Sequence, residues 1–348
     1  MAIRDIVQAA AGVGGGGEYV EDVFSTYLYD GSNSPQTITN NIDLDGEGGM
    51  VWFKRRDAVG NHRVLDTERG MTAPIGGGPT LNTNTTSEDR YTGFAGSVVA
   101  TSTGFDITQS GIGEINDSGG TYASWTFRKS PNFFDVVTWT GAGNGTSVNH
   151  SLGSTPAFII IKRTDISQNW IVYHKDLASG GFLRLDLTSA TGSGGSWISV
   201  SSSAISFPTA YSDTAVSGGT YVAYLFASNA GGFGDDGEQD VISCGSFTTD
   251  GSGNATVNLG YEPQFIISKS TTSTVDWYIA DNMRGMSYSN SPYLMPNNSL
   301  AEASPNFGVW IPTATGFTIT NLGTANNTHI YIAIRRPMKT PEAGTEVF

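Results

Sequence analysis

The chain has 348 residues, with 32 acidic and 18 basic side chains and a formal net charge of −14. A surface of that sign repels nucleic-acid phosphates and anionic membranes, so we expect no nucleic-acid partner and no membrane insertion. The single cysteine, Cys244, excludes an internal disulfide and a cysteine-based metal site.

Residues 2–11 are predicted to form a short helix, with Ile3, Ile6 and Val7 at helical spacing. Such a helix is too short to be stable alone in water. The glycine-rich residues 12–17 follow as a flexible tether. Their G-x-G-x-x-G pattern lacks the preceding strand that a dinucleotide site needs. We therefore expect Ile3, Ile6 and Val7 to dock the chain onto a partner protein.

From residue 18 onward one pattern is written three times. An apolar run closed by a lysine occurs at residues 49–54, 157–162 and 264–269, with the lysines 108 and 107 residues apart. A tyrosine-containing strand closes each copy, at Tyr122, Tyr221 and Tyr331. A period near one hundred residues is that of a whole small domain rather than of a solenoid repeat.

Short alternating or apolar segments separated by Asp-Gly and Gly-Gly turns predict six or seven strands in each copy. The predicted fold class is therefore all-β, with three tandem antiparallel sandwich-like modules. The predicted boundaries are 1–17 for the docking helix and tether, 18–130, 131–236 and 237–337 for modules 1, 2 and 3, and 338–348 for a tail. The sequence leaves open whether the modules form a line or a pseudo-threefold ring. In either case we expect Phe53, Ile160 and Ile267 to occupy matching core positions.

One polar motif recurs in two copies. Asp66 and Arg69 in module 1 match Asp281 and Arg284 in module 3, whereas Asp176 and Ser179 stand at the expected place in module 2. A carboxylate and a guanidinium three residues apart can form a forked ion pair. The pair could bind a sugar or act in catalysis, or it could brace a turn, and the repetition favours the brace.

The non-repeated Trp197 and Trp310 are candidates for exposed platforms that stack on sugar rings. Two acidic loops, at residues 43–47 and 235–240, could bind calcium or could be solvated turns, and the spacing of the first does not match the EF-hand pattern. No nucleophile elbow, zinc motif or phosphate-binding loop is present. We therefore predict no catalytic residues, no cofactor, no resident metal and no enzymatic activity.

Residues 48–54 with 65–70, residues 119–129, 151–162 and 259–269 together resemble β-rich modules in structural proteins of marine tailed bacteriophages. The resemblance covers nearly the whole chain. It implies a virion protein assembled in the host cytoplasm, most often a tail fibre or tail structural protein, and it brings no catalytic residues with it.

The predicted function is that of a tail fibre or receptor-binding protein that binds host surface glycan or protein through many weak contacts. Other virion proteins would hold its N-terminal segment, and a homo-oligomer is expected, with a trimer favoured by analogy with fibres. One alternative is a head fibre, capsid decoration or other structural role without host contact. A second alternative is a depolymerase that acts on surface polysaccharide.

Overall fold

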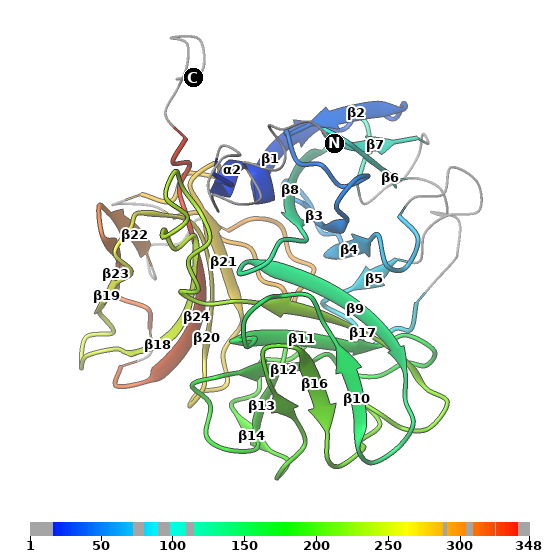
Figure 1. The fold of residues 1–348 in the computed structure, drawn as a ribbon. Helices are drawn as coiled ribbons and strands as arrows, with labels where there is room; N and C mark the ends of the chain where they lie inside the picture. The colour runs from blue at the N-terminus through cyan, green and yellow to red at the C-terminus, as the bar shows by residue number, and fades with distance from the viewer. Residues whose placement is uncertain are drawn as a thin grey trace.

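The computed structural model describes residues 17–71, 80–89, 98–108, 115–287, 291–303, 309–323 and 325–339. The predicted docking residues Ile3, Ile6 and Val7 lie outside the described residues. Of the described part, one four-residue helix and many short strands make up the regular structure (Figure 1). No helix among these residues is long and apolar enough to cross a membrane.

Each module consists of one large and one small antiparallel sheet. Module 1 follows helix α2 (Val20–Val23), and its strands are β1 (Phe24–Asp30), β2 (Gln36–Thr39), β3 (Gly49–Arg55), β4 (Arg63–Asp66), β5 (Leu81–Asn82), β6 (Val98–Thr101), β7 (Gly104–Ile107) and β8 (Thr121–Arg128). The large sheet has the order β1-β8-β3-β4-β5 and the small sheet the order β2-β7-β6.

Modules 2 and 3 repeat this strand order. Module 2 contains β9 (Phe134–Thr140), β10 (Thr146–Asn149), β11 (Phe158–Arg163), β12 (Ile171–His174), β13 (Gly181–Arg184), β14 (Gly192–Ser193), β15 (Ser199–Val200), β16 (Ala204–Phe207) and β17 (Thr220–Phe226). Module 3 contains β18 (Ile242–Thr248), β19 (Ala255–Asn258), β20 (Pro263–Ser270), β21 (Tyr278–Asp281), β22 (Val309–Thr313), β23 (Gly316–Thr320) and β24 (Thr328–Arg335). Their large sheets run β9-β17-β11-β12-β13-β14 and β18-β24-β20-β21, and their small sheets β10-β16-β15 and β19-β23-β22. The predicted all-β, antiparallel, triplicated fold is confirmed.

Strand register aligns the copies residue by residue. Ile160 and Ile267 occupy the same position in β11 and β20, and Trp52 of β3 is their equivalent. Phe53 lies one residue further along and packs with the opposite face, against Phe105 of its own small sheet. The expected match of Phe53 with the two isoleucines is therefore wrong, because side chains in a strand alternate between faces.

The closing strands need a similar correction. Tyr122 and Tyr221 each stack on an aromatic ring of the opening strand, with centroids 5.2 Å apart. In module 3 the same register position is held by His329, whose ring stacks on Phe247 at 5.1 Å. Tyr331 is thus two residues away from the position that its spacing predicts, although it lies on the same face of the strand.

The three central strands are buried on both faces, which explains their unbroken apolar runs. One face of each large sheet packs on the small sheet of its own module. The other face joins a core that all three modules share, where Phe127 of module 1 lies 5.6 Å from Phe226 of module 2 and 6.0 Å from Phe265 of module 3, between ring centroids. The modules therefore pack as a ring around a common centre rather than in a line.

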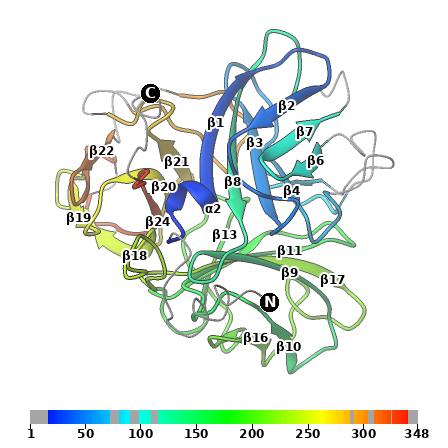
Figure 2. The same ribbon diagram turned by 45° about the horizontal axis from the view of Figure 1, so that its top comes forward.

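Helix α2 closes one end of this common core. Val20 and Val23 are fully buried in it, and Figure 2 shows α2 between the large sheets of modules 1 and 3. The far end of the described chain returns to the same place, because the backbone N–H groups of Met338 and Lys339 both donate to the Glu21 carboxylate at 2.7 Å. The first and last described residues therefore lie on one face of the ring.

Candidate functional site: the seams between the modules

Each module contacts the next through the same backbone hydrogen bond, which places the modules in a closed ring. We call these contacts seam 1/2, seam 2/3 and seam 3/1 after the modules they join. In each seam the residue two positions after the repeated lysine accepts an N–H from a loop of the neighbouring module. The bonds are Asp89 N to Thr164 O at 2.9 Å, Thr191 N to Thr271 O at 2.9 Å and Glu302 N to Arg56 O at 2.8 Å.

The repeated lysines hold the seams from inside. Lys54, Lys162 and Lys269 are fully buried, and the ammonium group of each donates to a carbonyl oxygen of the preceding module around the ring. Lys162 Nζ lies 3.1 Å from Thr86 O, Lys269 Nζ lies 3.1 Å from Thr188 O, and Lys54 Nζ lies 3.4 Å from Ser299 O. Burial lowers the pKa of Lys162 and of Lys269 to about 8, because the charged form loses its hydration.

A large aromatic side chain reinforces two of the seams. Trp170 Nε1 donates to Asn82 O across seam 1/2 at 2.9 Å, and Trp277 Nε1 donates to Arg184 O across seam 2/3 at 2.8 Å. His62 holds the equivalent place in seam 3/1, just before β4. Burial and the nearby cations, Lys54 first among them, hold the pKa of His62 well below its usual value, so it stays neutral.

In seam 1/2 the predicted Asp66–Arg69 pair is present and buried. Arg69 Nε lies 2.7 Å from Asp66 Oδ2, and Asp66 Oδ1 accepts the backbone N–H of Arg69, which braces the turn after β4. Tyr224 of module 2 donates its hydroxyl to Asp66 at 2.7 Å, and Asp89 accepts from Arg69 at 3.1 Å. The pair therefore serves as a brace and as a joint between modules.

Seam 3/1 repeats this arrangement with different donors. Arg284 Nε lies 2.7 Å from Asp281 Oδ2, and both side chains are fully buried. Trp125 of module 1 donates its indole N–H to Asp281 at 3.0 Å, and its ring lies under the guanidinium at 5.3 Å. Glu302 accepts from Arg284 at 3.2 Å, as Asp89 does from Arg69. Asp281 and Arg284 are thus closed to a soluble ligand.

Seam 2/3 has no such pair, and the expected alignment at this place is wrong. Register with Phe158 shows that His174, not Asp176, is the equivalent of Asp66 and Asp281. His174 is fully buried, and burial lowers its pKa to about 4. The apolar Ile332 stands where Tyr224 and Trp125 supply donors in the other seams. The neutral His174 ring therefore replaces the carboxylate in the seam where the neighbouring side chain, Ile332, cannot donate a hydrogen bond.

The predicted stacking platforms are wrong. Trp197 and Trp310 are each only 1% exposed, so neither ring face can meet a sugar. Trp197 packs edge-on against Phe182 and donates to Gly181 O at 3.3 Å, while Trp310 packs against Tyr293. The variable segments fold back over the sheets, and burying a large apolar ring there is favourable.

The acidic loops have local roles. Asp43 accepts the N–H of Gly46 at 2.8 Å, and Asp240 accepts the N–H of Gly231 at 2.9 Å. Such contacts brace turns. Among the described ranges, no three His, Cys, Asp or Glu side chains gather as a metal site.

A polar groove of about 410 Å³ opens on the surface at seam 1/2. One wall comes from module 1 and carries the charged side chains of Glu68, Arg69 and Asp89. The other wall comes from module 2 and carries hydroxyl groups and two aromatic rings, from Thr138, Trp139, Thr140, Thr164, Thr220 and Tyr221. Of these lining residues, only Arg69 is a candidate site residue from its sequence motif, because the others come from elements far apart in the chain.

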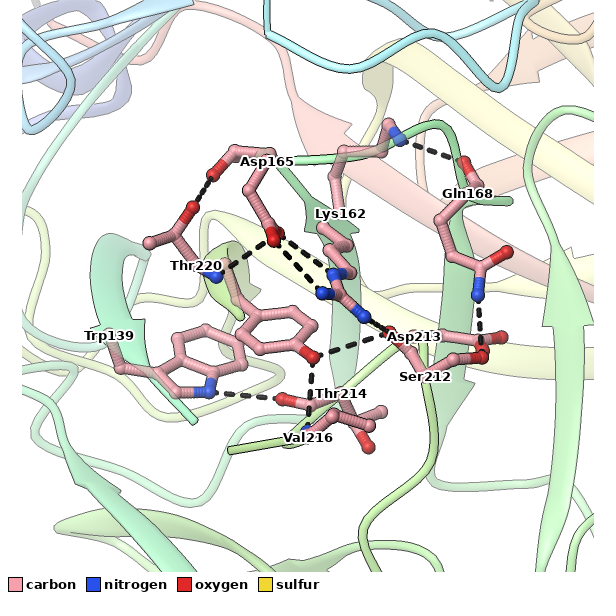
Figure 3. A network of polar contacts seen from close by, with 12 residues as sticks. Trp139, Lys162, Asp165, Gln168, Ser212, Asp213, Thr214, Val216 and Thr220 are labelled. Atoms are coloured by element: carbon pink, nitrogen blue, oxygen red, sulfur yellow. Dashed lines mark hydrogen bonds and ion pairs between the residues drawn. The ribbon is translucent and has the colours of Figure 1, made fainter. Parts of the chain in front are cut away.

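The module 2 wall is held rigidly. Asp165 accepts from the backbone N–H of Thr220 at 3.1 Å, as Figure 3 shows. Asp165 also accepts from Arg163 at 2.8 Å. Trp139 donates its indole N–H to Thr214 O at 3.0 Å and stacks on Tyr221. These contacts fix the groove wall before any ligand arrives, which lowers the cost of ordering it on binding.

A family model described as a domain of unknown function (DUF7483) matches residues 20–336. The match begins at α2 and includes all three modules, so the seams and the groove lie within it. No curated protein matches this chain.

Proposed function

The chain belongs to the family described as a domain of unknown function (DUF7483), and we propose that it is a structural protein of a bacteriophage particle. We propose specifically a tail fibre or receptor-binding component, held in the particle by its N-terminal segment. The sequence resemblance to phage structural proteins supports the proposal, and so does the arrangement of the chain ends.

The observation that carries the proposal is the common face of the two ends. Residues 17–23 and 336–339 lie together at one end of the ring, joined through Glu21 and through a Lys339–Asp22 ion pair at 3.5 Å. A body whose two terminal segments leave from one face can be mounted through that face. Its remaining surface then projects from the mount and stays free for contact.

The seams support a rigid projecting body. Buried lysines, tryptophans and forked ion pairs tie every module to both neighbours, so the ring moves as one unit. A rigid body presented in many copies on one particle can bind tightly through weak individual sites. Homo-oligomers of the chain would raise the local number of copies further, and light scattering of the purified protein tests for them.

The test is a deletion of residues 1–16, which precede the described residues and carry the expected docking side chains. The shortened chain should melt at the same temperature as the full chain, since the common core begins at Val20. It should be missing from purified particles in a quantitative immunoblot. A matched variant with Ile3, Ile6 and Val7 changed to Ser should be missing as well.

Two outcomes would count against the proposal. Normal incorporation of both variants would refute docking through the N-terminal segment. Gold-labelled electron microscopy that places the full chain on the capsid, with no binding of purified protein to host cells, would replace host attachment by a head-bound structural role.

A further inference from the structure

We propose that the groove at seam 1/2 binds an arginine side chain presented by a partner protein. The groove is lined by Glu68, Arg69 and Asp89 on one side and by threonine hydroxyls on the other. The same place in seam 3/1 shows which side chain fits there. The side chain that the groove accepts is independent of the proposed function of the whole chain.

Seams 1/2 and 3/1 have the same backbone hydrogen bonds around the groove. Arg56 and Thr164 both follow the repeated lysine by two residues, and both donate their backbone N–H to the start of the closing strand at 2.8 Å. Each also accepts the backbone N–H of an acidic residue of the neighbouring module, Glu302 for Arg56 and Asp89 for Thr164. Thr164 therefore stands where module 1 has an arginine.

In seam 3/1 that arginine fills the space. Arg56 donates to both carboxylate oxygens of Glu302, at 3.0 Å from Nε and 2.8 Å from Nη2. The Glu302 carboxylate holds the pKa of Arg56 above its usual value. Glu302 Oε2 also accepts from Arg284 at 3.2 Å, so one carboxylate here serves two guanidinium groups. The fold thus tolerates a second guanidinium next to the buried fork.

Seam 1/2 keeps the equivalents of Glu302 and Arg284, namely the Asp89 carboxylate and the Arg69 guanidinium. Asp89 accepts from Arg69 Nη1 at 3.1 Å, as Glu302 does from Arg284. The short Thr164 side chain leaves the groove where the long Arg56 side chain lies in seam 3/1. Glu68, whose carboxylate also accepts from Lys129 at 2.7 Å, adds a second carboxylate to the rim. The hydroxyls of Thr164 and Thr220 are hydrogen-bonded to each other at 2.6 Å, and their oxygens can still accept further N–H groups.

The chemistry favours arginine over lysine. A guanidinium is planar and donates two parallel hydrogen bonds to one carboxylate, as Arg56 does here, whereas an ammonium group is a compact point charge. A guanidinium is also weakly hydrated, so moving it into a half-enclosed polar groove costs less than moving an ammonium group. A long flexible side chain of a partner can reach in while the partner backbone stays outside.

The first test uses N-acetyl-L-arginine amide as the probe and saturation-transfer NMR as the readout, on the full chain. The wild-type protein should transfer saturation to the guanidinium side of the probe, and N-acetyl-L-lysine amide should receive much less. Thr164→Arg should abolish the transfer by filling the groove with the chain's own guanidinium. Thr256→Arg on β19, an exposed threonine in module 3, is the matched control and should behave as wild type.

The second test is the reverse change. Arg56→Thr should open a second groove in seam 3/1, lower the melting temperature, and increase the transfer to the arginine probe. Millimolar arginine probe should restore part of the lost melting temperature, and the lysine probe should not. By contrast, Thr164→Arg alone should raise the melting temperature by about 1–3 °C, because it adds a partly buried ion pair.

The proposal is overturned if the wild-type chain transfers no saturation to the arginine probe at millimolar concentration. It is equally overturned if Thr164→Arg and Thr256→Arg transfer saturation to the same extent, since binding would then lie elsewhere. Equal transfer to the arginine and lysine probes would show that the groove recognises charge alone and would refute the guanidinium assignment.

Discussion

Replacing two buried lysines with methionine should change how stability depends on pH. Lys162 and Lys269 are fully buried, and burial lowers their pKa to about 8. In the unfolded chain a lysine has a pKa of about 10.4. Between these values the unfolded state binds more protons than the folded state, so stability rises as the pH increases.

The size of the rise follows from the same shifts. Between about pH 8 and pH 9.5 each lysine should add about 1.6 kcal/mol to the free energy of unfolding, or about 3 kcal/mol for both. Cys244 lowers the free energy of unfolding over the same pH range. Burial raises the pKa of its thiol, whereas the thiol of the unfolded chain ionises near pH 8.5. That loss is about 1.2 kcal/mol over the same range. The buried tyrosines, whose pKa burial also raises, oppose the gain in the same direction. Neither contribution depends on the two lysines, so the difference between the wild-type chain and the double variant stays about 3 kcal/mol.

The assay is urea unfolding followed by tryptophan fluorescence at several pH values across this range. Over this pH range the free energy of unfolding should rise by about 3 kcal/mol less in the Lys162→Met/Lys269→Met variant than in the wild-type chain, and each single variant should lie between them. The comparison uses the pH dependence rather than absolute stability, so the loss of hydrogen bonds to Thr86 and Thr188 does not disturb it. Identical pH profiles for the wild-type chain and the double variant would refute the lowered pKa of the two seam lysines.

Three further changes test the seams and the core. Tyr224→Phe removes a hydroxyl donor from the buried Asp66 carboxylate and should lower the free energy of unfolding by about 1.5–3 kcal/mol in urea titrations; a loss below about 0.5 kcal/mol would show that the bond contributes little. The buried, neutral His174 has a pKa of about 4, so the unfolded state gains a proton first as the pH falls below about 6.5, and stability should drop by about 3 kcal/mol by pH 4 through this residue alone. His174→Gln should remove this part of the loss of stability at acid pH. If stability falls between about pH 6.5 and pH 4 as steeply in the variant as in the wild type, the lowered pKa of His174 is contradicted. Trp197→Ala should lower the free energy of unfolding by about 3–5 kcal/mol because it empties a buried site, whereas an exposed platform would lose almost nothing.

Much of the fold could be predicted from local patterns. The apolar runs at residues 49–54, 157–162 and 264–269 predict the central strands because such runs occur in strands buried on both faces. The closing strand of module 3 was misaligned because Tyr331 resembles Tyr122 and Tyr221 by name, whereas register gives that position to His329. Spacing in the sequence counts residues along the chain, whereas the loops and turns between the strands determine which residues pair in the sheet.

The seams could not be predicted, because their chemistry joins residues that are distant in the chain. Tyr224 and Asp66 are 158 residues apart, and only the packing of the large sheets brings the hydroxyl to the carboxylate. The prediction that Trp197 and Trp310 are exposed was wrong for the same reason, since no local pattern shows which residues cover a side chain in a variable loop. A usable signal was present in the unequal copies: aligned on the lysines, Arg56 stands where the other two copies have Thr164 and Thr271, and that position distinguishes seam 3/1 from the other two seams.

The ring gives this chain a freedom that three identical subunits lack. In a homotrimer every substitution appears at all three interfaces at once, so no interface can change without the others. Here one contact is ionic, one contains a hydroxyl-lined opening, and one has a neutral histidine beside an isoleucine. Single mutations can therefore specialise one joint for recognition while the other two continue to hold the assembly together.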